Sequence, residues 1–88
     1  MKGYVYILQS IKNKRFYIGS TKNVENRLKQ HQSGQVKATR NIRPLQIVFQ
    51  QEYPNIKQAR QIEYRIKRYK NRKIITQIIA DGEIKMGP

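Results

Sequence analysis

The first part of the chain alternates between apolar, aromatic stretches and polar segments. Residues 3–9 (GYVYILQ) and 15–19 (RFYIG) have the composition of β-strands, and the polar stretch 10–14 (SIKNK) separates them. This pattern predicts a β-hairpin. A four-residue loop would place Tyr6 opposite Tyr17 with both rings on one face, whereas a five-residue loop would place the two rings on opposite faces.

A short helix is predicted next, over residues 24–32. Asn23 is a favourable N-cap, and Gly34 provides a C-terminal stop. Arg27 and His31 are four residues apart, so they lie one above the other on a single face of this helix.

The rest of the pattern predicts a third strand and two more helices. Residues 35–44 are polar and basic without periodicity, which is typical of a surface loop, and residues 45–50 (LQIVFQ) are typical of a strand. Apolar residues then recur at helical spacing over residues 55–70, where Asn55 is a favourable N-cap, and again over residues 72–80. The order ββαβαα, without an internal repeat or linker, predicts one small layered structure of helices and strands.

Composition narrows the class of protein. A chain of 88 residues makes one domain, which we place at residues 1–83, followed by a loose tail at residues 84–88. Cysteine is absent and no apolar run is long enough to span a bilayer, so we expect a cytoplasmic protein, nucleoid-associated if it is bacterial. The sequence leaves the oligomeric state open.

The balance of charge indicates the partner. Nineteen Lys and Arg against five Asp and Glu give a net charge of +14, which favours nucleic acid over a membrane surface. Six of the nine residues from Arg65 to Lys73 are cationic, and such groups bind phosphates without reading sequence. For any single cation, a solvated surface position is the structural alternative. The residues that we assign to nucleic-acid binding are Lys22, Lys37, Arg40, Arg43, Lys67, Arg68, Lys70, Arg72 and Lys73.

Glu63 is the most informative acidic position. On a helical projection it falls at the edge of an apolar stripe, where a carboxylate costs free energy unless it is paired or bound to a metal. A structural salt bridge to Arg60 or Lys67 is the alternative. The other acids lie far from Glu63 in the predicted elements, so we do not expect a two-metal site. One Mg²⁺ held by Glu63, water and a substrate phosphate is reasonable coordination chemistry.

A metal site of this kind could hydrolyse a phosphodiester bond. A phosphodiesterase with one metal ion also needs a fixed cation and a proton acceptor. Arg27 is suited to the first task, because its planar guanidinium stays charged and grips phosphate oxygens. A tyrosine hydroxyl near the site, from Tyr6 or Tyr17, could accept the proton of the attacking water, and His31 could orient it or relay the proton. Alternatively, both tyrosines are ordinary core residues. Gly19 would allow a positive φ or a close approach of the backbone to phosphate.

Taken in order, these residues resemble a known family. Val5-Tyr6-Ile7 and Tyr17-Ile18-Gly19, followed by an arginine, a histidine and a distant glutamate, resemble the GIY-YIG nuclease superfamily. The closest likeness is to small stand-alone members related to the amino-terminal nuclease domain of the excision-repair protein UvrC. The stretch RFYIGSTKNVENRLKQHQSG is the most specific part, and the likeness covers roughly residues 2–82.

The resemblance implies a three-stranded antiparallel sheet flanked by helices, and a metal-dependent endonuclease acting on DNA, in repair or recombination. It also implies roles for single residues. Tyr6 and Tyr17 would be the motif tyrosines, one of them contacting the attacking water, and Gly19 would be the motif glycine. Arg27 would stabilise the pentacovalent phosphate. Glu63 would be the lone carboxylate ligand of one Mg²⁺ or Mn²⁺, with His31 near the site.

The sequence departs from the family pattern in two places. Tyr4 and Val5 replace the Gly and Ile of the first motif, and Ser20 stands where related domains carry a lysine, unless Lys22 takes over its contact. RNA is a further candidate substrate. A non-catalytic nucleic-acid-binding module with the same fold is the alternative function.

Overall fold

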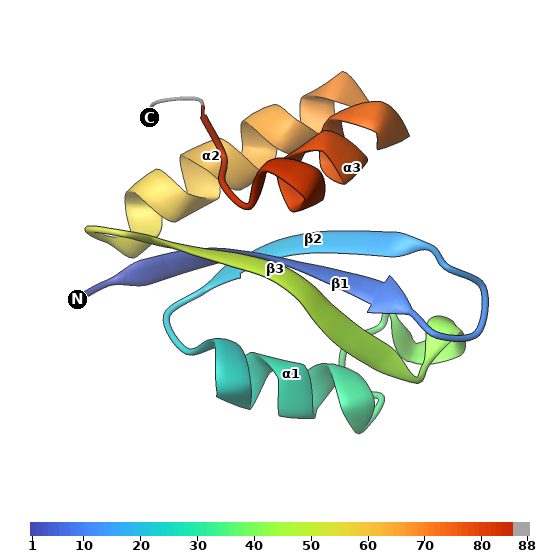
Figure 1. The fold of residues 1–88 in the computed structure, drawn as a ribbon. Helices are drawn as coiled ribbons and strands as arrows, with labels where there is room; N and C mark the ends of the chain where they lie inside the picture. The colour runs from blue at the N-terminus through green and yellow to red at the C-terminus, as the bar shows by residue number, and fades with distance from the viewer. Residues whose placement is uncertain (86–88) are drawn as a thin grey trace.

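The computed structural model describes residues 1–85, and its centre is an antiparallel sheet of three strands. The strands are β1 (Gly3–Ser10), β2 (Phe16–Thr21) and β3 (Leu45–Tyr53), in the order β2-β1-β3. The first strand therefore pairs on both sides, and β2 is an edge strand (Figure 1).

Three helices cover the two faces of this sheet. The helix α1 (Val24–Gln32) lies on one face, and α2 (Ile56–Tyr69) and α3 (Arg72–Asp81) lie on the other (Figure 1). The expected order ββαβαα and the three-stranded antiparallel sheet are confirmed. A short 3-10 turn, η1 (Arg40–Ile42), lies within the segment expected to be a loop.

Alternation along β1 produces two separate apolar clusters. Val5 and Ile7 point toward α2 and α3 and pack in the larger cluster, while Tyr6 and Leu8 point toward α1 and pack with Leu45. All four β1 side chains are at most 1% exposed. The central strand thus anchors both helical layers and places a tyrosine on the α1 side.

The hairpin between β1 and β2 differs from both predicted registers. Gln9 lies opposite Phe16 and Leu8 opposite Tyr17, so the connecting loop has six residues rather than four or five. Tyr6 therefore faces Gly19 and not Tyr17, although both tyrosines do lie on the α1 side of the sheet.

The loop is stabilised by its own polar groups. Ser10 Oγ accepts hydrogen bonds from the amides of Lys12 and Asn13 (3.1 Å each), and the Asn13 side chain accepts one from the amide of Arg15. Lys14 adopts a positive φ of 66°. Composition does not reveal this conformation, because a non-glycine residue in the left-handed region is uncommon.

The predicted helix ends agree with the structure. The side chains of Asn23 and Asn55 cap α1 and α2, accepting from the amides of Asn26 and Gln58 (3.0 and 2.9 Å). Gly34 has a φ of 84°, which only glycine adopts freely just after a helix.

Two strands are longer than expected. The second strand continues two residues beyond Gly19, and the third continues to Tyr53 instead of ending at residue 50. This extension places Ser20 inside β2. Its side chain points to the α2 side because strand residues alternate, as for Ile18 in the larger cluster.

The first residue of the expected tail packs against the rest of the structure. We predicted a loose tail over residues 84–88, but Ile84 is 6% exposed and its amide donates to Gln51 Oε1 (2.7 Å). Residues 86–88 lie outside the described part. Within residues 1–85, no helix is both long enough and apolar enough to cross a membrane.

Candidate active site

A buried chain of hydrogen bonds connects β1, α1 and the segment that follows α1. The Tyr6 hydroxyl lies 2.9 Å from His31 Nε2, and His31 Nδ1 lies 2.7 Å from Thr39 Oγ1. His31 and Thr39 are both fully buried, and Tyr6 is 1% exposed. Each ring nitrogen of the histidine therefore has a fixed hydroxyl partner, which sets the orientation of the imidazole and of the tyrosine hydroxyl.

Gly19 makes room for the Tyr6 ring. A methyl group at Gly19 would lie 2.6 Å from Tyr6 Cζ, closer than any real contact allows. The described glycines with positive φ are Gly34 and Gly82, so Gly19 is not needed for its backbone conformation. Of the two roles expected for Gly19, the positive φ is therefore wrong, and the close approach to phosphate stays a prediction. The glycine is required because an aromatic ring crosses it on the neighbouring strand.

Three rings gather on the α1 side of the sheet. Their centroids are 6.4 Å apart for Tyr6 and Tyr17, 5.8 Å for Tyr6 and His31, and 5.0 Å for Tyr17 and His31. Tyr17 is half-buried on the edge strand, whereas Tyr6 is covered. Tyr17 is thus the tyrosine that a solvent molecule or a substrate reaches more easily.

Arg27 lies beside both tyrosine hydroxyls. Hydrogen bonding to Tyr6 is the main reason that the pKa of Arg27 is raised, and Tyr17 contributes as well. Its guanidinium also donates from Nη1 to Gln30 Oε1 (2.7 Å). The helix spacing that placed Arg27 and His31 on one face therefore brings a permanent cation to the tyrosine pair.

Burial sets the charge of this group of residues. Desolvation raises the pKa of Tyr6 to about 12, opposed by its hydrogen bond with Arg27. Desolvation, followed by the charge of Arg27, lowers the pKa of His31 to about 4. At neutral pH, His31 is therefore an uncharged imidazole and Tyr6 keeps its proton.

Glu63 reaches the same strand from the opposite layer. Ser20 Oγ donates to Glu63 Oε1 (2.5 Å), and Lys67 Nζ pairs with Glu63 Oε2 (2.7 Å). The side chain of Glu63 is 20% exposed. Of the two alternatives weighed for this residue, the ion pair with Lys67 is present, and it leaves the carboxylate partly open to the surface.

The candidate site has two halves, one on each face of the sheet, and they meet around the edge of β2. Tyr17 and Arg27 approach from the α1 side, and Glu63 and Lys67 approach from the α2 side. Lys67 Nζ also lies 5.4 Å from the centroid of the Tyr17 ring, so one lysine contacts both halves. Since β2 has no neighbour on its outer side, nothing in the sheet separates them.

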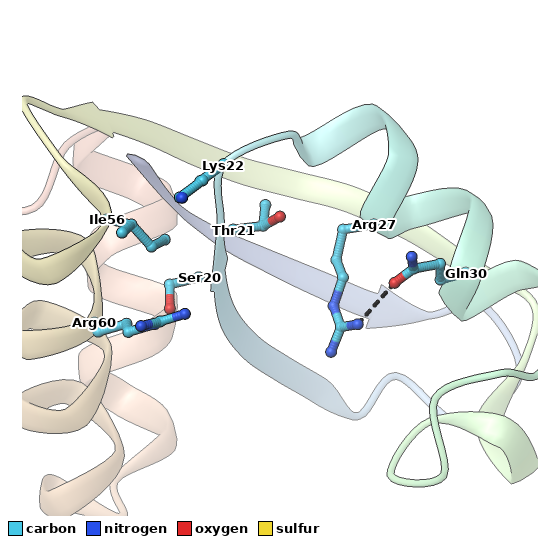
Figure 2. Close-up of a pocket in the computed structure, with 7 residues that line it drawn as sticks. All are labelled: Ser20, Thr21, Lys22, Arg27, Gln30, Ile56 and Arg60. Atoms are coloured by element: carbon cyan, nitrogen blue, oxygen red, sulfur yellow. Dashed lines mark hydrogen bonds between the residues drawn. The ribbon is translucent and has the colours of Figure 1, made fainter. Parts of the chain in front are cut away.

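A cationic cavity opens at this edge. It has a volume of about 520 Å³, and Figure 2 shows Arg60 and Ser20 on the α2 side of the strand and Arg27 on the α1 side. Lys22 adds a third cation to the wall, and none of the lining residues is acidic. The residues that line the cavity are Ser20, Thr21, Lys22, Arg27, Gln30, Ile56 and Arg60. Such a wall suits an anion, and phosphate in particular.

The oxygen atoms around Glu63 fit a single hard cation. Mg²⁺ takes one or two carboxylates and completes its shell with water and substrate phosphate. Glu63 and the Ser20 hydroxyl are such oxygen donors, and the paired Lys67 is 47% exposed, so its ion pair exchanges readily. Within residues 1–85, no group of three or more His, Cys, Asp or Glu side chains could hold a metal ion.

The other cations predicted to bind nucleic acid differ in their surroundings, because some hold parts of the fold together and others are simply exposed. Arg40 donates to the Gly34 carbonyl (2.9 Å), and Arg43 donates to the carbonyls of Arg40 and Gln32 (2.9 and 3.3 Å), so both help to hold the segment after α1. Arg72 lies 4.5 Å from the Phe16 ring centroid and donates to the Lys14 carbonyl. The remaining exposed cations of the set are Lys37, Arg68, Lys70 and Lys73.

Sequence reasoning missed three residues of this site. Thr39 was one polar residue in a basic loop, and only its burial beside His31 distinguishes it. Ser20 was noted as a lost lysine, yet its hydroxyl binds Glu63. Arg60 was considered only as a partner of Glu63. Its position one turn before Glu63 on the same helix could have indicated that it faces the cavity.

Comparison with known proteins shows which family the chain belongs to. The profile of the GIY-YIG catalytic domain matches residues 2–75. The UPF0213 protein of Staphylococcus saprophyticus is 34% identical over 82 residues, which cover 92% of this chain and 98% of that protein. The UPF0213 protein of Oceanobacillus iheyensis is 40% identical over 65 residues, covering 73% and 74%.

A solved structure from the same group of proteins has a similar fold. The solution NMR structure of the UPF0213 protein BH0048 from Bacillus halodurans shares 35% identity and a TM-score of 0.57, and the match covers 93% of this chain and 87% of that one. The chain belongs to the GIY-YIG family, as one of its small UPF0213 proteins.

Proposed function

We propose that this protein is a divalent-metal-dependent endonuclease that hydrolyses phosphodiester bonds in DNA with one metal ion. Two observations at the open edge of β2 carry the proposal. Lys67, the ion-pair partner of Glu63, lies against the Tyr17 ring. Ser20, which donates to Glu63, lines the same cationic cavity as Arg27. Membership of a family of catalytic domains supports it. A module that only bound nucleic acid would need no carboxylate among these cations.

Arg27 and Arg60 would bind the scissile phosphate. Both line the cavity, from opposite sides of β2 (Figure 2). The additional negative charge of the pentacovalent transition state falls on the phosphate oxygens, so a permanent cation at Arg27 stabilises that state more than the ground state. The hydrogen bond from Arg27 Nη1 to Gln30 Oε1 (2.7 Å) helps to hold the guanidinium in place before substrate arrives.

Tyr17 would contact the attacking water. It is the half-buried member of the pair, while Tyr6 is covered and keeps its proton because its pKa is about 12. We therefore assign positioning roles to Tyr6 and to the His31–Thr39 chain behind it. In this arrangement the buried hydroxyls and imidazole fix the guanidinium and the neighbouring ring rather than accept the proton of water.

Glu63 would hold one Mg²⁺ or Mn²⁺, with the Ser20 hydroxyl orienting its carboxylate. When bound, the ion would act as a Lewis acid on the phosphate and would neutralise developing charge on the leaving oxygen.

Nicking of supercoiled plasmid DNA tests this function. We expect relaxation with Mg²⁺ or Mn²⁺ and none in EDTA, and a loss of rate on the order of 100-fold in Arg27→Ala, the size found when a preorganised charge donor is removed. Lys29→Ala is the matched control, because Lys29 is an exposed cation on the same helix, and it should keep the wild-type rate within about twofold. Binding of DNA without nicking under any metal condition would support the non-catalytic module instead.

A further inference from the structure

One side of α2 carries a strip of cations beside Glu63. Successive helical residues are about 100° apart, so the residues that follow Glu63 and Ile56 around the helix, moving away from the core, are Lys67, Arg60, Tyr64, Lys57 and Arg68. Glu63 is the only acidic residue of α2. Arg60 lines the cavity, so this strip continues outward from the proposed active site.

An exposed tyrosine occupies the middle of the strip. The side chain of Tyr64 is 63% exposed, and the guanidinium carbon of Arg68 lies 5.7 Å from its ring centroid. This cation–π contact steadies the ring on the surface. Aromatic rings and guanidinium planes are the groups on which proteins stack unpaired bases, and flanking cations bind the backbone phosphates.

A second exposed tyrosine on the same helix provides a comparison. Tyr69 is 54% exposed, but it lies five residues later and about 140° around the helix from Tyr64, away from Arg60 and Glu63. The two tyrosines thus have similar exposure and the same secondary structure. They differ in their position relative to the cavity.

We propose that Tyr64, steadied by Arg68, is a stacking platform for an unpaired nucleobase next to the phosphate held at the cavity. This inference rests on the proposed nuclease function, because the cavity defines where the strand lies. Lys57 and Arg60 neutralise phosphates on either side of the platform. The substrate class is a polynucleotide with at least one unpaired base near the cleaved bond, since bases within a duplex are already stacked on each other.

Binding measured without metal tests the platform separately from cleavage. The probes are a fluorescently labelled 12-nucleotide oligothymidine, the same strand with abasic sites throughout, and a 12-base-pair duplex, all in EDTA. Stacking is worth roughly 1–3 kcal/mol per base, so Tyr64→Ala should weaken binding of oligothymidine at least about fivefold. Tyr64→Phe, which keeps the ring, and Tyr69→Ala should each stay within about twofold of wild type.

The other probes separate stacking from charge. In Tyr64→Ala, affinity for the abasic strand and for the duplex should stay within about twofold of wild type, because neither offers a free base. Equal affinities of Tyr64→Ala and Tyr69→Ala for oligothymidine would overturn the proposal. A loss in Tyr64→Phe as large as that in Tyr64→Ala, or an equal loss on the abasic strand, would overturn it too.

The nicking assay then distinguishes the two proposals. Tyr64-dependent binding by a protein that never nicks DNA would leave the platform standing and reject the nuclease. Metal-dependent nicking by a protein whose binding ignores Tyr64 would reject the platform and leave the nuclease standing.

Discussion

At the scale of single residues, the site depends on close contacts that restrict which side chains can occupy each position. No side chain fits at Gly19, because the Tyr6 ring crosses it, and the Tyr6 hydroxyl is in turn held by His31. The motif glycine was evident in the sequence, but its role was not. Its role depends on a register that places Tyr6 opposite Gly19, and that register follows from the six-residue hairpin loop.

Replacing Gly19 by alanine should therefore displace Tyr6. We expect a destabilisation of about 1–3 kcal/mol, the usual cost of overpacking. We also expect at least a tenfold slower nicking rate, because the displaced Tyr6 ring disturbs the neighbouring Tyr17 and His31 rings of the site. Thermal denaturation and plasmid nicking provide the measurements.

The control is a double-mutant cycle with Tyr6→Ala. Once the ring is removed, Gly19→Ala should have little further effect on stability, giving a coupling free energy close to the cost of the single substitution. Additive effects would show that the contact between Gly19 and Tyr6 is not the cause.

At the scale of elements, α1 is joined to the sheet through a buried polar residue. His31 from α1 lies between Tyr6 of β1 and Thr39 of the following segment, with Arg27 the nearby charge. Helix periodicity predicted that Arg27 and His31 share a face, and the caps at Asn23 and Asn55 were evident from their residue types. Thr39 was not predictable, because its partner is far away across an aperiodic loop and only tertiary packing brings them together.

This buried histidine should make folding pH-dependent. The pKa of His31 is about 4 in the folded protein and about 6.5 when unfolded, so between these values the unfolded chain binds the extra proton. The free energy of unfolding should thus fall as pH decreases from about 6.5 to about 4, by up to roughly 3 kcal/mol from this group. Above about pH 6.5 the group contributes no pH dependence.

Urea denaturation of wild type and His31→Gln across this range provides the measurement. The variant should be less stable at neutral pH, and its stability should change less between about pH 6.5 and 4, because glutamine does not titrate. A pH dependence in His31→Gln as steep as that of wild type would assign the effect to the carboxylates.

At the scale of the whole molecule, charge determines how a polyanion approaches. A net charge of +14 predicted a nucleic-acid partner, but it could not distinguish phosphate contacts from structural cations. Arg40 and Arg43 hold backbone carbonyls, whereas Lys22 and Arg60 line the cavity. Only the three-dimensional arrangement distinguishes the structural cations from those that line the cavity, because all four are simply basic residues in the sequence.

DNA binding should therefore be strongly salt-dependent, and unequally so among cations. Between about 50 and 200 mM salt, we expect affinity to fall by at least about tenfold, as counterion release requires. Lys22→Gln should make the negative slope of log affinity against log salt shallower by about one. Arg43→Gln should leave that slope nearly unchanged but lower the melting temperature, because its guanidinium holds the segment after α1. Fluorescence anisotropy titrations and thermal melts give both quantities, and a flat salt response would contradict the assignment.

The most direct test of the proposed active site is the nicking rate of Glu63→Gln with saturating Mg²⁺. This change keeps the size of the side chain and its hydrogen bond from Ser20 but removes the charge that would bind the ion. Glu52→Gln is the matched control, since Glu52 pairs with Lys2 on the exposed surface. We predict a rate at least about 100-fold below wild type for Glu63→Gln and an unchanged rate for Glu52→Gln. Wild-type nicking by Glu63→Gln would contradict the account.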